Sequence, residues 1–308
     1  MISVIIATLN RAEALRSISL PSLARQNRGD FEVIVWDASD GGDSKIVCES
    51  FSRKFEARNI QLRYFKAARK GLASQRNDST DHALGSVLFF IDDDCEVSVD
   101  AVHSISVCFD SFPWLNGVGV PMLNKTPASG KSSVMRFATL LFGMKNNQLH
   151  RVINKHGGLS LPIKDLPGPA EWLSGGSMSF RKMVFERVRF DERLEIFGGY
   201  ALGEDYDFSY RVMLEFGQPH LISNGGYVVH HAAAGDRITG IERMAAHFFN
   251  AELIRGNFKK YGRRFNPVRV AWGHLGTFLY LLKSGAKPMD IISGIRLARA
   301  KLKLRDQT

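Results

Sequence analysis

Three consecutive aspartates are the residues of this chain whose spacing most clearly suggests chemistry. Asp92, Asp93 and Asp94 directly follow the apolar run 87–91, which predicts a buried strand that ends in carboxylates. Like charges at this spacing repel, and a bound divalent cation is the usual compensation, because Mg²⁺ and Mn²⁺ prefer oxygen ligands. The alternative is that the acids begin a helix, with one of them at the N-cap. The triplet alone leaves both interpretations open.

The elements that must position these acids alternate along the first part of the chain. Short apolar runs predict strands, and the segments between them have helical patterns. Strand–helix alternation indicates an α/β fold, with a largely parallel sheet and helices on both of its faces. We predict strands at 3–7, 31–36, 60–65 and 86–91, and helices at 11–26, 44–58 and 72–84.

Polar residues follow three of the predicted strands directly. They are the segment Thr8–Asn10, Asp37, and the triplet Asp92–Asp94. Sheets of this kind bind ligands at the carboxyl ends of their strands. We therefore expect these residues to converge at one edge of the sheet, although they lie far apart in the sequence.

The remainder of the chain has weaker patterns. Its last part predicts three basic helical segments from Gly240 onward, broken near Pro267 and Pro288. Before that we predict a strand at 117–123, a loop at 126–133, a short helix at 133–144, a mobile loop at 164–169, a helix at 203–216 and a strand at 221–229.

Length and composition indicate a globular protein. A chain of 308 residues fits one large domain, or one domain plus an appendage. The start of the chain predicts a first strand rather than a signal peptide, and no run reaches the roughly 18 apolar residues of a membrane span. The scattered cysteines Cys48, Cys95 and Cys108 match no disulfide framework or zinc spacing, which favours a reducing cytoplasm.

The positive charge of the chain is concentrated at its C-terminal end. Residues 235–308 contain 15 Lys/Arg and 5 Asp/Glu, so their net charge of +10 equals that of the whole chain. An excess of this kind suggests an anionic partner, either membrane lipid or nucleic acid. Nucleic acid is the weaker candidate, because no known binding motif accompanies the charge.

One basic segment, 287–305, has the pattern of an amphipathic helix. Its apolar residues Ile291, Ile295, Ala298 and Leu302 recur at helical spacing among Lys and Arg. Such a helix is typical of membrane surfaces. The alternative is that its apolar face packs on the main domain and its charges face solvent.

Six segments with recognisable motifs follow one another along the chain. They are SVIIATLNR (3–11), VWDASDG (35–41), KGLASQRN (70–77), FIDDD (90–94), WLSGGSMSFRK (172–182) and GEDYDFSYR (203–211). In this order they resemble family 2 inverting glycosyltransferases of the GT-A fold. The resemblance covers roughly residues 1–232 and implies a GT-A domain at 1–234, which the basic helical region at 235–308 follows.

The resemblance implies a binding site for a nucleotide-diphosphate sugar donor. Alternative roles are a turn for Asp37, a helix N-cap for Asn10 and a solvated helix position for Arg76. Gly71 is expected to adopt an unusual backbone angle before a helix. The donor-side residues that the resemblance implies are Thr8, Asn10, Arg11, Asp37, Gly71, Arg76, Asn77, Asp92 and Asp93, the last without a separate chemical task.

The resemblance also implies a site for Mg²⁺ or Mn²⁺. Asp94 would ligate the cation directly, and Asp92 would contact the ribose or a metal-bound water. His230 would be a third ligand, although a histidine at a strand end is often structural. The cation would stabilise the nucleoside-diphosphate leaving group.

Transfer with inversion needs one carboxylate to accept the proton of the acceptor hydroxyl. The resemblance assigns this task to Asp205, next to Glu204; the alternative is that acids simply favour a helix N-terminus. Trp172, Gly175 and Gly176 resemble the acceptor-side loop, and the alternative for Trp172 is an ordinary core position.

The expected function is therefore sugar transfer to a glycan or a lipid-linked acceptor, with the protein in the cytoplasm and peripheral on an anionic membrane surface. One alternative is a nucleotidyltransferase, which would need a Gly-rich phosphate loop where this chain has ATLNR. A second is a non-catalytic relative that acts as a membrane-surface scaffold.

Overall fold

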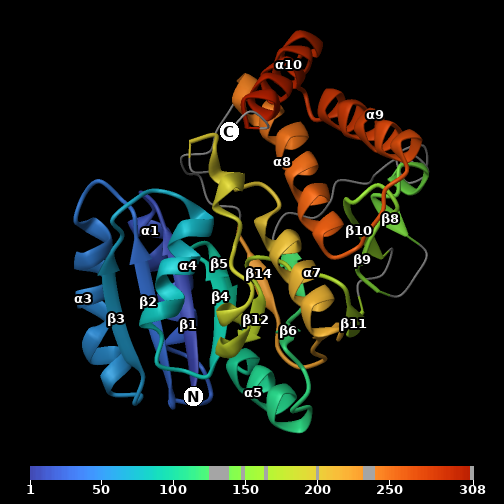
Figure 1. Cartoon of the computed structure of the whole chain (residues 1–308). Helices are drawn as coiled ribbons and strands as arrows, with labels where there is room; N and C mark the ends of the chain where they lie inside the picture. The colour runs from blue at the N-terminus through green and yellow to red at the C-terminus, as the bar shows by residue number, and fades with distance from the viewer. Residues whose placement is uncertain (125–138, 147–149, 163–165, 199–200, 232–239, 306–308) are drawn as a thin grey trace.

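The computed structural model describes residues 1–308 except 125–138, 147–149, 163–165, 199–200, 232–239 and 306–308. Its centre is an eight-stranded sheet in the order β11-β13-β6-β12-β4-β1-β2-β3 (Figure 1). The strands of this sheet are β1 (Ile2–Thr8), β2 (Phe31–Asp37), β3 (Gln61–Lys66), β4 (Val87–Asp92), β6 (Gly117–Gly119), β11 (Gly168–Ala170), β12 (Met178–Arg181) and β13 (His220–Ile222).

The half of the sheet built by the N-terminal part of the chain is parallel. β1 pairs in parallel with both β2 and β4, and β2 pairs in parallel with β3. β12 is antiparallel to β4 and β6, so the sheet as a whole is mixed. β1 and β2 are buried on both faces, which explains why they are nearly continuous apolar runs. The predicted α/β fold is confirmed.

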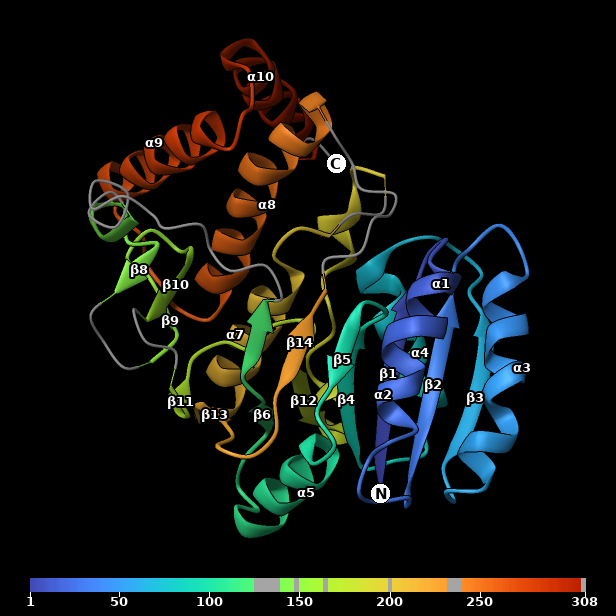
Figure 2. The same cartoon turned by 180° about the vertical axis from the view of Figure 1, so that it is seen from behind.

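Helices cover both faces of the sheet, and alternate residues of β1 show which core each face contributes to. Ile2, Val4 and Ile6 pack with α1 (Ala12–Ala14), the π-helical turn Leu15–Ser19, α2 (Leu20–Leu23), α3 (Asp43–Glu56) and α5 (Ala101–Ser111). Ile5 faces the other core, which contains residues of α4 (Leu72–His82) and α7 (Glu204–Phe216). α4 and the α1–α2 segment accordingly lie on opposite sides of the sheet (Figures 1 and 2).

Two predicted strands are wrong in extent, because each one divides between two sheets. The segment 117–123 breaks near Pro121, which lacks the N–H that a central strand would donate. The segment 221–229 breaks at a turn where Gly226 has a φ of +72°. The second halves form a three-stranded sheet in the order β5-β14-β7, from β5 (Cys95–Val97), β14 (Val228–His230) and β7 (Met122–Asn124).

An insertion between β7 and β12 forms a smaller sheet in the order β8-β10-β9, with β8 (Lys145–Asn146), β9 (Val152–Ile153) and β10 (Leu159–Pro162). The predicted loop 126–133 and the first half of the predicted helix 133–144 lie outside the described residues, and residues 139–141 of the second half are helical. The predicted mobile loop 164–169 is wrong at its end, since Gly168 and Pro169 belong to the edge strand β11, where a proline is tolerated. Two short 3₁₀ helices, Lys182–Glu186 and Glu192–Glu195, follow β12.

The three predicted C-terminal helices are present, with breaks at the expected prolines. They are α8 (Gly240–Lys260), α9 (Pro267–Lys283) and α10 (Pro288–Arg305). α8 contributes Phe249 and Phe258 to the same core as α7. None of the helices in the described part of the chain is long and apolar enough to cross a membrane.

α10 packs along α8 through its apolar face. Ile291 and Ala298 are buried, and Ile295 and Leu302 pack against the same core. Gly294 allows the close approach, because a Cβ at this position would lie 2.4 Å from the Cβ of Met244 and 2.8 Å from the backbone nitrogen of Ala245. The apolar face of α10 therefore packs on the protein, which is the alternative to membrane binding that the sequence left open for this helix.

We expect Gly294→Ala to lower the free energy of unfolding by about 1–3 kcal/mol, because the added methyl group meets the backbone of α8. Gly256→Ala, within α8, is the matched control, since its Cβ would have no neighbour within 4 Å. Higher helix propensity should make that control neutral or more stable by up to about 1 kcal/mol. Urea unfolding measures both, and equal shifts in the two variants would contradict the packing of α10 on α8.

Candidate active site

A cavity of about 700 Å³ lies at the carboxyl ends of β1 and β4. The strand register aligns Ala7 with Asp92 and Thr8 with Asp37, so the predicted convergence at one edge of the sheet is confirmed. The predicted residues that line the cavity are Thr8, Asn10, Arg11, Gly71, Arg76, Asp92, Asp93, Asp94, Gly175, Gly176, Glu204, Asp205 and His230.

The aspartate triplet forms the tight connection between β4 and β5, so it does not begin a helix. Asp93 accepts hydrogen bonds from the Thr8 hydroxyl at 2.7 Å and from Arg11 Nη1 at 2.9 Å. The same Arg11 nitrogen lies 3.0 Å from Asp94 Oδ2. Burial raises the pKa of Asp93 to about 6, although Arg11 acts in the opposite direction. Asp93 thus holds the loop after β1 against the end of β4.

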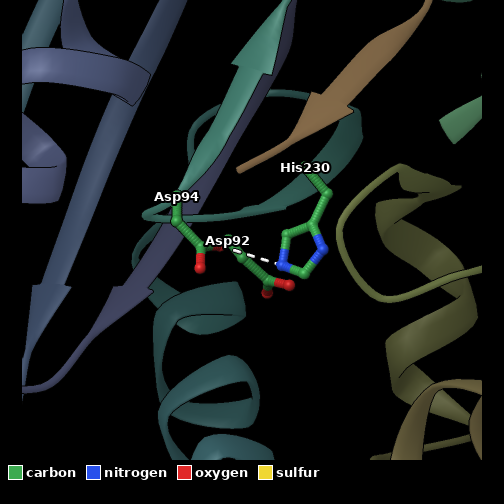
Figure 3. Close-up of side chains that lie close together, drawn as sticks. All are labelled: Asp92, Asp94 and His230. Atoms are coloured by element: carbon green, nitrogen blue, oxygen red, sulfur yellow. Dashed lines mark ion pairs between the residues drawn. The ribbon is translucent and has the colours of Figure 1, made fainter. Parts of the chain in front are cut away.

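Asp92, Asp94 and His230 form a cluster that could hold a metal ion. One possible ligand atom from each lies within 4.8 Å of the others, and His230 Nε2 is 3.3 Å from Asp94 Oδ1. His230 reaches the acids because β14 pairs with β5, which aligns His230 with Cys95. The imidazole and the two carboxylates point toward one another in Figure 3.

The chemistry of this donor set fits Mn²⁺ or Mg²⁺, since carboxylates suit both ions and imidazole suits transition metals. The formal charges of the cavity agree. Among its described lining residues are five carboxylates but only three Lys/Arg side chains, which leaves a formal excess of two negative charges. A divalent cation would compensate that excess.

Arg76 joins three separate segments at the floor of the cavity. Its Nη1 lies 2.6 Å from Glu204 Oε1, and its Nη2 lies 3.1 Å from Asp92 Oδ1 and donates to the Gly175 carbonyl at 3.2 Å. The guanidinium is buried, so the solvated helix position considered from the sequence is wrong. These contacts fasten the start of α4 to the end of β4 and the start of α7.

Glu204 and Asp205 begin α7, after Gly203 in the left-handed region at a φ of +87°. Asp205 accepts hydrogen bonds from the backbone N–H of Gly175 at 3.0 Å and of Tyr206 at 2.9 Å. Burial is the main cause that raises the pKa of Asp205, and these bonds oppose it. Burial and the charge of Asp205 raise the pKa of Glu204 to about 8, against the effect of Arg76.

The glycines of the 174–176 loop leave room for charged side chains. A Cβ on Gly175 would lie 3.0 Å from Arg76 Nη2, and one on Gly176 would lie 2.9 Å from Cys95 Sγ and 3.2 Å from Asp92 Oδ2. Either substitution would therefore displace a side chain of the cavity. The loop lines the same cavity as Asp205, the position expected for an acceptor-side segment.

Glu195 supports the start of α4 beside the site, although no motif in the sequence predicted this role. Its carboxylate accepts hydrogen bonds from the backbone N–H groups of Ala73 at 3.2 Å and Ser74 at 3.0 Å, and so caps α4. Gly71 has a φ of +143°, and a Cβ there would lie 2.0 Å from Glu195 Oε2. The unusual backbone angle expected at Gly71 is confirmed, and the close approach of Glu195 is a second reason for glycine.

Gln75 is another residue that sequence reasoning missed. Its side-chain amide donates to the Thr8 carbonyl at 3.1 Å and to the Trp36 carbonyl at 3.0 Å, and so joins the ends of β1 and β2.

Asn10 does not cap the following helix, where Arg11 occupies the N-cap. Instead Asn10 has a φ of +55°, and its side chain accepts from the Asp40 backbone N–H at 3.3 Å.

Three predicted site residues are not among the residues that line the cavity. Asp37 is buried, accepts from the Ser39 backbone N–H at 2.9 Å and from the Tyr64 hydroxyl at 2.8 Å, and so forms the turn considered as its alternative. Asn77 exchanges hydrogen bonds with the backbone of Phe190. Trp172 lies in the core, the alternative considered for it. Binding roles for these three side chains stay predictions.

Comparison with known proteins identifies sequence relatives of the N-terminal third. Residues 3–105 match the family model for Glycosyl transferase family 2. A GalNAc(5)-diNAcBac-PP-undecaprenol beta-1,3-glucosyltransferase of Campylobacter jejuni is 28% identical over 106 residues, which cover 34% of this chain. The matched region spans 33% of the relative's own length.

Solved glycosyltransferases share the fold over most of the chain. S. aureus TarS in complex with UDP-GlcNAc has a TM-score of 0.57 at 18% identity, over 83% of this chain and 66% of that one. GalNAc-T7 with UDP, GalNAc and Mn²⁺ has a TM-score of 0.59 at 17% identity, over 82% and 47%. The mannosyltransferase PcManGT from Pyrobaculum calidifontis, with GDP-Man and Mn²⁺, has a TM-score of 0.52 at 18% identity, over 98% and 79%.

The contacts of Arg76 predict a large cost for its removal. At a pH above the raised pKa of Glu204, we expect Arg76→Met to lower the free energy of unfolding by about 3–5 kcal/mol, because the buried Glu204 carboxylate then loses its counter-charge. Adding Glu204→Gln to that variant should restore part of the loss. Arg25→Met is the control, since its pair with Glu96 is exposed and worth under about 1 kcal/mol. Urea unfolding of the single and double variants gives the coupling, and purely additive effects would contradict the pairing.

Proposed function

From its resemblance to family 2 glycosyltransferases and its GT-A fold, we propose that this chain is a metal-dependent inverting glycosyltransferase. It would transfer a sugar from a nucleotide-diphosphate sugar to a glycan or a lipid-linked acceptor. The observation that carries the proposal is that one cavity contains both the Asp92–Asp94–His230 cluster and Asp205. The cluster suits a diphosphate leaving group, because it could hold a cation, and Asp205 suits the activation of a hydroxyl.

The donor side of the cavity is built from the loops after β1 and β4 and from the start of α4. Thr8, Asn10, Arg11 and Gly71 lie there, with Arg76 beneath them. Asp94 and His230, with Asp92, are the residues that would hold the cation. When bound, a divalent cation offsets the charge of the diphosphate and so makes the nucleoside diphosphate a better leaving group.

Asp205 is the residue that we assign as the general base. As the acceptor oxygen forms its bond to the anomeric carbon, the bond from that carbon to the diphosphate oxygen breaks. The proton of the acceptor hydroxyl passes to the Asp205 carboxylate. The backbone N–H groups of Gly175 and Tyr206 hold this carboxylate in place. Glu204 instead keeps Arg76 in position.

The acceptor that we propose is a glycan or a lipid-linked glycan. The Campylobacter relative is named for an acceptor on undecaprenol diphosphate, which supports an acceptor of this class here. The +10 net charge of residues 235–308 suits an anionic membrane surface close to such an acceptor. The cysteines Cys48, Cys95 and Cys108 are free thiols, as suits the cytoplasmic face.

We expect Asp205→Asn to lower kcat at least about 100-fold while donor affinity changes little, because the amide cannot accept the proton. Release of nucleoside diphosphate in the presence of acceptor measures turnover, and calorimetry measures donor binding. Asp290→Asn is the control, since it also removes an acid from the first turn of a helix, here α10, but is not among the residues that line the cavity. Undiminished turnover of the Asp205 variant would exclude it as the base, and release of pyrophosphate would indicate a nucleotidyltransferase.

We expect Asp94→Ala to abolish the increase in donor affinity that Mn²⁺ causes, because the cluster loses a carboxylate that bridges cation and protein. Donor titrations with Mn²⁺ and with a chelator measure the difference. Asp110→Ala, on the exposed face of α5, is the control and should keep the full metal effect. Identical titration curves with and without Mn²⁺ in the unmodified protein would contradict metal dependence.

A further inference from the structure

The helix α9 presents an apolar stripe to solvent. Val268, Trp272, Leu275 and Leu279 lie on one face at spacings of four, three and four residues, with exposed fractions of 76%, 43%, 44% and 44%. We call these four side chains the α9 stripe. Contiguous large apolar side chains on a surface mark an interaction site, because leaving them in water costs free energy.

The other faces of α9 are already occupied by the protein. Gly273, Gly276 and Leu281 are buried, and Phe142 stacks on one side of the Trp272 ring with centroids 4.9 Å apart. α8 lies between α9 and the large sheet in both views (Figures 1 and 2). The helix is therefore anchored on its inner side, and the stripe faces away from the body of the molecule.

Positive charge surrounds the stripe. Residues 253–289 contain eight Lys/Arg and no Asp/Glu. At the N-terminal end of α9, a cavity of about 470 Å³ is lined by the cations Lys155, Arg263, Arg264 and Arg269, together with Gly262, Phe265 and Asn266. We call this the basic pocket. It shares no lining residue with the cavity that contains Asp205.

We propose that α9 docks the protein on an anionic lipid bilayer, with the stripe in the boundary between headgroups and acyl chains and the basic pocket around lipid phosphates. A helix in this position buries its apolar face about 5–10 Å deep and keeps Lys and Arg at headgroup level. Tyr280, which is 51% exposed, suits the same layer, because its ring combines an apolar body with a polar tip. The proposal deepens the membrane association proposed above and rests on it.

Charge complementarity selects the bilayer over a second copy of this chain. Two copies that met through the stripe would bring two basic segments together, since residues 252–290 of each copy contain eight Lys/Arg against only Glu252 and Asp290. An anionic bilayer supplies both an apolar layer and phosphates. The stripe and the pocket are also adjacent, since Val268 and Arg269 are neighbours at the start of α9.

The apolar part of the proposal is tested by flotation with vesicles of phosphatidylcholine, with and without phosphatidylglycerol. We expect Leu275→Ser with Leu279→Ser to weaken binding to anionic vesicles at least about 10-fold, because two apolar side chains no longer enter the boundary. Leu84→Ser with Val107→Ser is the matched control, since these side chains are 60% and 46% exposed and lie elsewhere. Equal binding of the two double variants would overturn the role of the stripe.

The charged part is tested by Arg263→Gln with Arg264→Gln and Arg269→Gln. We expect about 100-fold weaker binding to anionic vesicles, since each cation near such a surface contributes separately. Arg16→Gln with Lys45→Gln and Arg53→Gln removes the same net charge from other exposed positions and should bind within a few-fold of the unmodified protein. Equal losses in both triple variants would show that only net charge matters and would overturn the assignment to this pocket.

Further measurements separate the remaining occupants. Thermal stabilisation by inorganic phosphate, without a preference for anionic vesicles, would identify a free-phosphate site and overturn bilayer docking. Light scattering could also show dimers that the Leu275→Ser, Leu279→Ser variant dissociates. That result would indicate self-association through the stripe and would overturn bilayer docking. None of these measurements uses the donor, whereas donor turnover in the absence of vesicles tests the proposed chemistry separately. Loss of turnover with intact flotation would therefore contradict the catalytic assignment alone.

Discussion

The arrangement of the cavity depends on how two arginines compensate crowded carboxylates. Asp92 and Asp94 belong to one connection and Glu204 to a distant part of the chain, and carboxylates brought together in a buried setting repel strongly. Arg76 lies between Asp92 and Glu204, and Arg11 binds Asp93 and Asp94. Buried ion pairs are favourable only when further hydrogen bonds support them, and Arg76 has such support because it also donates to the Gly175 carbonyl.

Because the arginines pair with some carboxylates more closely than with others, the two sides of the cavity differ in the side chains that could act on a ligand. On one side, Asp92 and Asp94 face His230, and the formal negative excess is the kind that a divalent cation removes. On the other side, Glu204 is held by Arg76, whereas Asp205 is held only by backbone N–H groups. The charge of Arg76 also acts on Asp205 and opposes the rise of its pKa, but backbone N–H groups orient the carboxylate. This arrangement suits the general base that we propose.

Much of this could be predicted from strand–helix alternation. The parallel strands place Thr8 and Asp92 at one edge whatever the details of packing, so their convergence followed from the sequence. The pairing of Arg76 with Glu204 did not, because it joins residues that lie 128 positions apart and depends on how α7 packs beside α4. The capping of α4 by the Glu195 carboxylate could not be predicted either, because Glu195 is also far from α4 in the sequence.

Predicted site residues that do not line the cavity have a different physical cause. A motif indicates which residue stands at the end of an element, but not which way its side chain turns. Asp37 turns back to its own loop, where Ser39 and Tyr64 satisfy it, and Trp172 enters the core. The division of 221–229 into two strands was also concealed, because an apolar run indicates burial but not which sheet it joins.

The sequence pattern also could not show which of the basic C-terminal helices has an exposed apolar face. α9 and α10 both combine apolar positions with Lys and Arg, and the pattern in the sequence pointed to α10 as the helix at the membrane. An apolar face has the same spacing whether it meets protein or lipid, so periodicity cannot choose between them. Burial can: Ile291 and Ala298 of α10 are covered by the protein, whereas Leu275 and Leu279 of α9 are exposed. The positive charge of the region then fits the bilayer docking that we propose for α9, while α10 packs on α8.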